Sequence, residues 1–136
     1  GAVEQVVLDQ ADKDIILIEG QGSLLHPGST ATLPLMRGSC PTHLILCLRA
    51  EIKSLRSPEH IKIPDLNNFI ALNESLASVF GTFSRSRVIG IAANTSMLSE
   101  DDAKAYLSMT SKHTGLVTTD PIRYGIAPIG EQILIS

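Results

Sequence analysis

Three short apolar runs, each followed directly by polar residues, constrain the fold of this chain more than any other feature. The runs are Ile15–Ile18, Leu44–Leu48 and Val88–Ala93. Each run is continuous rather than alternating, which is typical of strands that are buried on both faces of a parallel sheet. Helical patterns lie between the runs, so the sequence predicts an α/β fold with a largely parallel sheet between two helical layers.

The other elements follow from start and stop signals. We expect a helix end at Ala2–Gln10, because its valines are spaced as in a helix, and the first strand at Ile15–Glu19. Further predicted helices are Thr30–Arg37, a segment from Pro64 at the first helical position to Gly81, and a segment capped by Ser99 and closed by Gly115. Arg49–Ile63 is irregular, Leu116–Thr118 is a short fourth strand, and Ile129–Ile135 is either a short helix and strand or an edge strand.

Composition excludes several classes of protein. The 136 residues suit one domain, and 43% hydrophobic residues suffice for a core. A net charge of −3, without a Lys/Arg cluster and with few aromatic residues, argues against nucleic acid as a partner. No apolar run approaches the roughly 18 residues of a membrane span. Cys47 lies inside an apolar run, so we expect a buried free thiol and a cytoplasmic protein.

Polar clusters follow three of the predicted strands. They are Glu19 with the loop after it, Asn94-Thr95-Ser96, and Asp120-Pro121 with Arg123. Because ligands of parallel α/β sheets bind outside the carboxyl ends of the strands, these clusters predict one shared site for a small molecule.

Glu19 and the loop Gly20–Gly28 form the first candidate wall of this site. A carboxylate at a strand end can hold Mg²⁺ or orient an attacking group, but it can also cap the loop or pair with a cation. The loop could offer N–H groups to an anion, or its glycines could only allow a tight turn. His26 could act as a general base or simply bond to a backbone carbonyl. No His or Cys pair has zinc-site spacing.

The other two clusters have comparable alternatives. Asn94 can bond to a nucleobase edge through its amide, or it can form a turn with its own backbone. Asp120-Pro121 is by itself a helix start. Arg123 could hold a carboxylate or phosphate, or it could sit in a surface ion pair.

Several strings resemble a known family. They are IEGQGSLLHPG, TLPLMRGSCPTHLILC, IGIAANTS with LSEDDA, and VTTDPIRYG. Together they resemble the carboxyl-terminal domain of a bacterial and archaeal family, long uncharacterised, of which some members are described as D-glutamate N-acetyltransferases. The resemblance covers nearly the whole chain and is weakest at Arg49–Ile63. It implies a P-loop NTPase-like domain, similar to dethiobiotin synthetase, behind an amino-terminal Rossmann-like domain.

The resemblance also implies roles for individual residues. Glu19 would be the Walker-B-like acid, and therefore the Mg²⁺ ligand, while Gln21, Gly22, Ser23, His26 and Pro27 would form the site loop. Asn94, with Thr95 beside it, would meet an adenine. Asp120, Pro121 and Arg123 would close over the nucleotide or substrate.

One part of the family pattern is missing. No GxxxxGK[ST] motif is present, and in the family it lies upstream of the position of Gly1. We therefore expect residues 1–136 to be a single partial domain, with the Walker A segment and the Rossmann-like domain outside it and no cofactor bound to the fragment itself. The strand Ile15–Glu19 would then pair with a second copy in a homo-oligomer or with the upstream segment, or would rearrange.

Three functions remain at this point. The resemblance implies acetyl transfer from acetyl-CoA to an acidic amino acid, with Arg123 on a carboxylate and Glu19 or His26 as proton acceptor. The first alternative is an ATP- and Mg²⁺-dependent activity like that of dethiobiotin synthetase. The second alternative is a non-catalytic oligomerisation scaffold.

Overall fold

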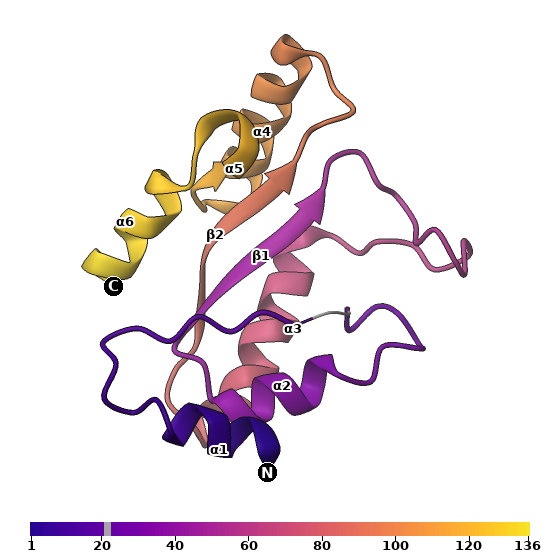
Figure 1. The fold of residues 1–136 in the computed structure, drawn as a ribbon. Helices are drawn as coiled ribbons and strands as arrows, with labels where there is room; N and C mark the ends of the chain where they lie inside the picture. Colours follow the sequence, from indigo (N-terminus) through magenta and orange to yellow (C-terminus); the bar gives the residue numbers. More distant parts are fainter. Residues whose placement is uncertain (21–22) are drawn as a thin grey trace.

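The computed structural model describes residues 1–20 and 23–136 and confirms an α/β architecture (Figure 1). Its elements are α1 (Ala2–Leu8), α2 (Thr32–Ser39), β1 (His43–Arg49), α3 (Leu66–Ser78), the 3₁₀ turn η1 (Val79–Gly81), β2 (Arg87–Asn94), α4 (Glu100–Thr114), β3 (Thr118–Thr119), α5 (Pro121–Tyr124) and α6 (Ala127–Ile135). None of the helices in these ranges has both the length and the apolar character needed to cross a membrane.

The sheet of the described residues has three parallel strands in the order β1-β2-β3. The pairing of β1 with β2 runs from His43 opposite Arg87 to Arg49 opposite Asn94. All three strands therefore end on one edge, as the sequence predicts. Thr119, the last residue of β3, directly precedes Asp120, which brings two of the predicted polar clusters to that edge.

The core is centred on β2. Ile91 and Ile129 are fully buried, and Ile89 is nearly so. Gly90 lets α6 approach the strand closely, because a Cβ at this position would lie 2.9 Å from Cγ1 of Ile129. Ile89 and Ile91 point to the opposite side of the strand from Gly90, since side chains alternate, and they are buried there too. The central strand β2 is thus covered on both faces, which agrees with the predicted layers.

Helix boundaries agree with the sequence signals in most places. The Ser99 hydroxyl caps α4 by accepting from the Asp102 N–H at 3.1 Å, and Gly115 ends the helix with φ of 71°. Pro64, however, is not the first helical residue of α3. Asp65 is the N-cap instead, because its carboxylate accepts hydrogen bonds from the N–H groups of Asn67 and Asn68. Pro64 therefore lies one residue before the cap. The chain end is helical, as α6.

The predicted first strand, Ile15–Glu19, is wrong for this structure. The segment has no regular secondary structure and pairs with no strand of the described residues. Its apolar side chains are open to solvent, with Leu17 82% exposed. A strand requires a neighbouring backbone to satisfy its N–H and C=O groups, and apolar sequence alone does not supply one. The run therefore remains an extended apolar segment.

The predicted burial of Cys47 is also wrong. Cys40 and Cys47 are both free and both exposed. Cys47 lies on β1, which has β2 as its single strand neighbour in the described part of the chain. A continuous apolar run indicates burial on both faces only where the strand is flanked and covered, and β1 is an edge strand here.

Candidate functional site

A pocket of about 550 Å³ opens at the carboxyl edge of the sheet. Its walls come from the ends of β1 and β2, the segment after β2, and the start of α5. The lining residues are Cys47, Leu48, Ala92, Ala93, Asn94, Ser96, Asp120, Pro121, Ile122 and Arg123. We call this hollow the first pocket. It contains members of two of the three predicted polar clusters, so their convergence at one edge is observed.

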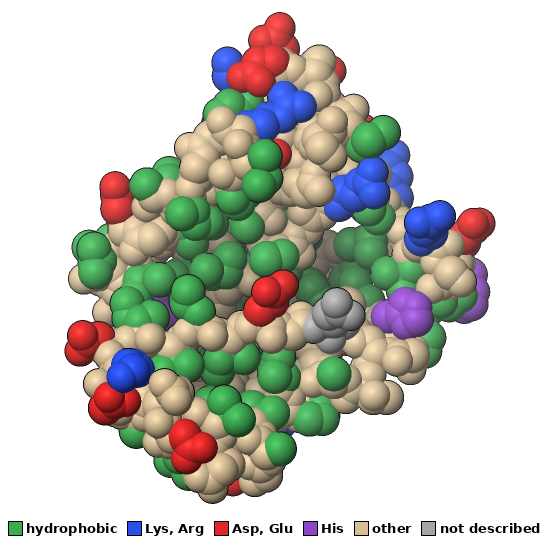
Figure 2. All heavy atoms as spheres, in the orientation of Figure 1, with side chains coloured by type: hydrophobic (Ala, Val, Ile, Leu, Met, Phe, Trp, Pro, Cys, Tyr) green, Lys and Arg blue, Asp and Glu red, His purple; other side chains and the backbone are tan. Residues whose placement is uncertain are grey.

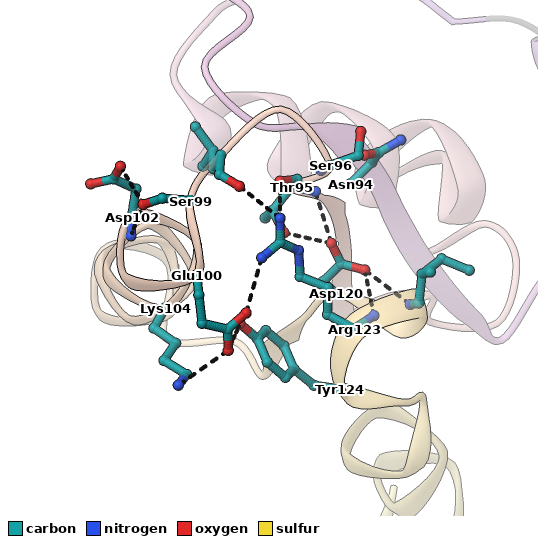
Figure 3. A network of polar contacts seen from close by, with 12 residues as sticks. Asn94, Thr95, Ser96, Ser99, Glu100, Asp102, Lys104, Asp120, Arg123 and Tyr124 are labelled. Carbon is teal, nitrogen blue, oxygen red and sulfur yellow. Dashed lines mark hydrogen bonds and ion pairs between the residues drawn. The ribbon is translucent and has the colours of Figure 1, made fainter.

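Asp120 joins the end of β2 to the start of α5 (Figure 3). Its Oδ2 accepts from the N–H of Thr95 at 2.9 Å and from the Thr95 hydroxyl at 2.6 Å. Its Oδ1 accepts from the N–H of Ile122 at 2.9 Å and from that of Arg123 at 3.2 Å. Asp120 is 3% exposed and Thr95 is fully buried. Both carboxylate oxygens are therefore occupied within the fold.

The electrostatics of Asp120 follow from these bonds. Burial by itself raises the pKa of the Asp120 carboxyl, but the hydrogen bonds from Thr95, Arg123 and Ile122 outweigh it and hold the pKa below the usual aspartate value. Asp120 is thus ionised at neutral pH and braces the pocket wall. Its side chain has the role of an N-cap, one of the two readings of the sequence.

Arg123 is anchored by three bonds of its guanidinium (Figure 3). One terminal nitrogen donates to Oε2 of Glu100 at 3.0 Å, and the other donates to the carbonyl oxygens of Thr95 and Leu98 at 3.2 and 2.7 Å. The side chain is one-quarter exposed. Arg123 therefore fixes the segment between β2 and α4, and both of its terminal nitrogens already have partners.

Glu100 is the centre of this network and was not foreseen from the sequence. Its carboxylate also accepts from Lys104 at 3.1 Å and from the Tyr124 hydroxyl at 2.9 Å. These contacts, first that of Lys104, lower the pKa of Glu100, while burial and the Glu100 carboxylate raise the pKa of Tyr124. The one available signal is local: Glu100 and Lys104 are four residues apart on one helix.

Asn94 and Ser96 line the first pocket beside this brace. Oδ1 of Asn94 accepts from the N–H of Ser96 at 3.0 Å, which is the turn-forming reading. The bond uses the carbonyl half of the amide. Within the described residues, the Asn94 NH₂ group and the Ser96 hydroxyl have no hydrogen-bond partner. Both can therefore bond to a ligand in the pocket.

Glu19 does not line the first pocket, but its charge acts on Cys47, which does. Partial desolvation raises the pKa of the Cys47 thiol, although the residue is exposed, and the negative charge of Glu19 adds to the rise. Cys47 lines the pocket, so the Glu19 carboxylate stands within electrostatic range of it. The role of Glu19 as the acid of the third predicted cluster stays a prediction.

His26 is held away from the first pocket by two contacts. Its Nδ1 accepts from the N–H of Gly28 at 3.0 Å, so its Nε2 carries the hydrogen and donates to the carbonyl oxygen of Ser57 at 2.8 Å. Ser57 belongs to the loop that follows β1. These contacts match the reading of His26 as a loop histidine bonded to a backbone carbonyl.

The rest of the predicted site loop is partly described. Gln21 and Gly22 lie outside the described residues. Ser23 accepts from the N–H of Leu25 at 3.1 Å through its hydroxyl, and its own N–H donates to the hydroxyl of Ser29 at 2.9 Å. Pro27 is exposed in the same turn. None of the described loop residues lines the first pocket.

A resident metal ion finds little support in this donor set. Among residues 1–20 and 23–136, no three His, Cys, Asp or Glu side chains converge as a metal site. Glu19 could still bind Mg²⁺ in the way typical of nucleotide enzymes, where one or two carboxylates act together with substrate phosphates and water. The donors therefore fit a metal that arrives with a ligand.

Proteins of known sequence and structure resemble this chain over nearly its whole length. A D-glutamate N-acetyltransferase from Tritonibacter scottomollicae is 34% identical over 126 residues, which are 92% of this chain and 37% of that protein. One from a Pseudoalteromonas species is 32% identical over 130 residues, 95% of this chain and 39% of the relative. The chain thus spans about two fifths of the length of these relatives.

The crystal structure of a DUF1611 family protein from Anabaena variabilis has the same fold. It is 47% identical, its TM-score is 0.96, and the match covers 100% of this chain and 40% of the other. Residues 1–130 also match a family model described as "Domain of unknown function (DUF1611_C) P-loop domain". The chain therefore belongs to the DUF1611 family, as its carboxyl-terminal P-loop domain.

Proposed function

We propose that this domain is part of a small-molecule enzyme that transfers an acetyl group from acetyl-CoA to the amine of an acidic amino acid. The main support is the position of the first pocket at the carboxyl edge of the sheet, where ligands of parallel α/β sheets bind. Relatives of this chain are named D-glutamate N-acetyltransferases. Because the chain spans about two fifths of those relatives, the activity belongs to the longer protein.

The first pocket suits a neutral, planar part of the acyl donor. The charged groups Asp120 and Arg123 are paired within the wall, while the Asn94 NH₂ group and the Ser96 hydroxyl lack partners in the described residues. Leu48, Ala92 and Pro121 supply apolar surface. An adenosine moiety, which acetyl-CoA and ATP share, offers a base edge to the amide and a flat face to the apolar wall.

The proposed reaction is a simple acyl transfer. The amine nitrogen attacks the thioester carbonyl carbon, a C–N bond forms, the C–S bond breaks, and CoA leaves as the thiol. The amine loses one proton to a nearby base, and the base passes it to the departing CoA sulfur. Glu19 fits this role better than His26, because both ring nitrogens of His26 are already hydrogen-bonded.

The full-length protein tests this proposal directly. Acetyl-CoA and D-glutamate are mixed with it, and release of CoA thiol is followed together with formation of N-acetylglutamate by mass spectrometry. We expect both products, and Glu19→Gln should slow the reaction whereas Asp14→Asn, an acid on the same segment, should not. The absence of CoA release from the intact protein would contradict acetyl transfer. A cytoplasmic homo-oligomer is the expected form, which cell fractionation and light scattering would check.

A second candidate is ATP- and Mg²⁺-dependent chemistry. The observation in its favour is that the matching family is described as a P-loop domain. Glu19 would then hold Mg²⁺ together with the phosphates of ATP, and the first pocket would again take the adenosine. Release of ADP from Mg-ATP by the full-length protein separates the two candidates, because acetyl transfer from acetyl-CoA consumes no ATP.

A further inference from the structure

A second pocket lies on the other side of Leu48. It encloses about 310 Å³ between the end of β1, the start of α3 and the last turns of α4. Leu48 lines both pockets. The polar side chains around the second pocket are Arg49, Lys53, Asp65, Tyr106 and His113. Apolar groups, including Ile63 and Pro64, form the rest of the wall.

The acid of the second pocket is already hydrogen-bonded through both of its oxygens. Oδ2 of Asp65 accepts from Nε2 of His113 at 2.7 Å, and Oδ1 accepts from the N–H groups of Asn67 and Asn68. The amide of Asn67 also donates to the His113 carbonyl oxygen at 3.1 Å. This link between α3 and α4 lowers the pKa of Asp65, first through the bond from His113. The Asp65 carboxylate is therefore engaged in the link between the two helices.

The remaining polar groups of the pocket can all donate hydrogen bonds. Within the described residues, the side chains of Arg49, Lys53 and Tyr106 have neither a hydrogen bond nor an ion pair. Two of them, Arg49 and Lys53, are basic side chains. A pocket whose unpaired groups are two cations and a hydroxyl favours an anion with several acceptor oxygens.

The fold fixes the backbones that carry the two cations. Arg49 is the last residue of β1, opposite Asn94 in the sheet. The carbonyl oxygen of Lys53 accepts from the N–H of Ile63 at 2.9 Å, and Ser54 forms a bridge with Lys62. The two ends of the loop after β1 are thus hydrogen-bonded to each other. Figure 2 shows Lys and Arg side chains gathered over this loop, beside the hollow in the face.

We propose that the second pocket holds a carboxylate of the acidic amino acid that accepts the acetyl group, with Arg49 and Lys53 as its specificity-determining residues. This inference rests on the proposed function and replaces the earlier assignment of the carboxylate to Arg123, whose two terminal nitrogens are already bonded to Glu100, Thr95 and Leu98. Because Leu48 lines both pockets, the second pocket neighbours the first at the carboxyl edge of the sheet.

The test measures binding to the full-length protein. D-Glutamate, glutarate (a dicarboxylate without an amine) and inorganic phosphate are titrated while the imidazole proton signals of His113 are followed by NMR. D-Glutamate and glutarate should shift these signals, and Arg49→Gln with Lys53→Gln should weaken their binding about tenfold. Arg56→Gln removes an exposed cation from the same loop without touching the pocket and should change nothing.

Contrary outcomes are distinct. Equal affinity in the double variant, no shift at His113 in the wild type, or phosphate binding as tightly as glutarate would each overturn the proposal. Kinetics then separate it from the proposed function: the double variant should raise KM for D-glutamate and leave KM for acetyl-CoA unchanged. Glutarate binding without any acetyl transfer would refute the function and retain the dicarboxylate pocket. Transfer with an unchanged KM for D-glutamate would do the reverse.

Discussion

The two pockets at the carboxyl edge of the sheet differ in how their charges are used. In the first, Asp120 and Arg123 are bonded to the wall itself, and neutral groups remain for a ligand. In the second, Asp65 is paired, but Arg49 and Lys53 are unpaired within the described residues. A charged residue near a pocket therefore says little about the ligand until its partners are known.

The largest expected effect concerns the brace of the first pocket. Asp120→Asn replaces one acceptor oxygen by an NH₂ group that faces buried N–H or hydroxyl donors. The free energy of unfolding should fall by about 2–3 kcal/mol, measured by urea denaturation. Asp101→Asn, on an exposed part of α4, is the matched control and should cost less than about 1 kcal/mol. Equal losses would mean that Asp120 is not a brace.

The same aspartate predicts a pH dependence of stability. Its pKa is lower in the folded state than in the unfolded chain, where it is about 3.9. Its stabilising contribution is therefore complete above about pH 4 and is lost as the pH falls through the lower folded value. Across this range, the free energy of unfolding should change more with pH for the wild type than for Asp120→Asn, as measured by denaturation curves at each pH. Identical curves would contradict the assignment.

Protection of a thiol would show whether the first pocket is occupied. Cys47 lines this pocket and Cys40 does not. Adenosine at ten times its dissociation constant should slow alkylation of Cys47 about tenfold, because only the free form reacts. Cys40, followed by mass spectrometry in the same sample, should react at an unchanged rate. Glutarate should protect neither, and protection of Cys47 by glutarate would erase the distinction between the pockets.

Salt should affect the two pockets differently. The Debye length shortens from about 30 Å at 0.01 M to about 8 Å at 0.15 M ionic strength, which screens exposed charges such as Arg49 and Lys53. Glutarate binding should weaken about threefold over this range. Adenosine binding, which we assign to neutral groups, should change much less. An equal salt dependence of both ligands would show that the second pocket is not distinguished by its charges.

The smallest expected effect is a change in the alkylation rate of Cys47, which tests whether Glu19 lies near it. Its charge contributes to the raised pKa of Cys47, so Glu19→Gln should lower that pKa and speed alkylation of Cys47 at pH 7.5 about twofold. Asp14→Asn removes a charge from the same segment and serves as the control. A rate that responds equally to both changes would place Glu19 no nearer to the first pocket than Asp14.

The parallel sheet and its edge could be predicted from the sequence, but the pairing of individual strands could not. Leu44–Leu48 and Val88–Ala93 are strands because each finds a neighbour. Ile15–Glu19 has the same composition and is not a strand, since strand formation depends on a partner backbone that lies elsewhere in sequence. The predicted burial of Cys47 failed for the same reason.

The site could be predicted only as far as its location. The strand-end pattern predicted that Asn94, Asp120 and Arg123 would lie together, and they line one pocket, while their roles toward a ligand stay predictions. The side-chain hydrogen-bond partners of Arg123, such as Glu100 and Thr95, lie 23 to 28 residues away in sequence. No local sequence pattern reveals such partners. The pairing of Asp65 with His113, 48 residues apart, escaped prediction in the same way.

Leu48 has a thermodynamic consequence. One side chain forms part of the wall of both pockets, so a ligand that moves it in one pocket changes the space available in the other. Any resulting coupling is reciprocal: the factor by which the first ligand alters the affinity of the second equals the factor in the opposite direction. An order in which two substrates are taken up could thus be set by a single apolar residue that touches neither reacting atom.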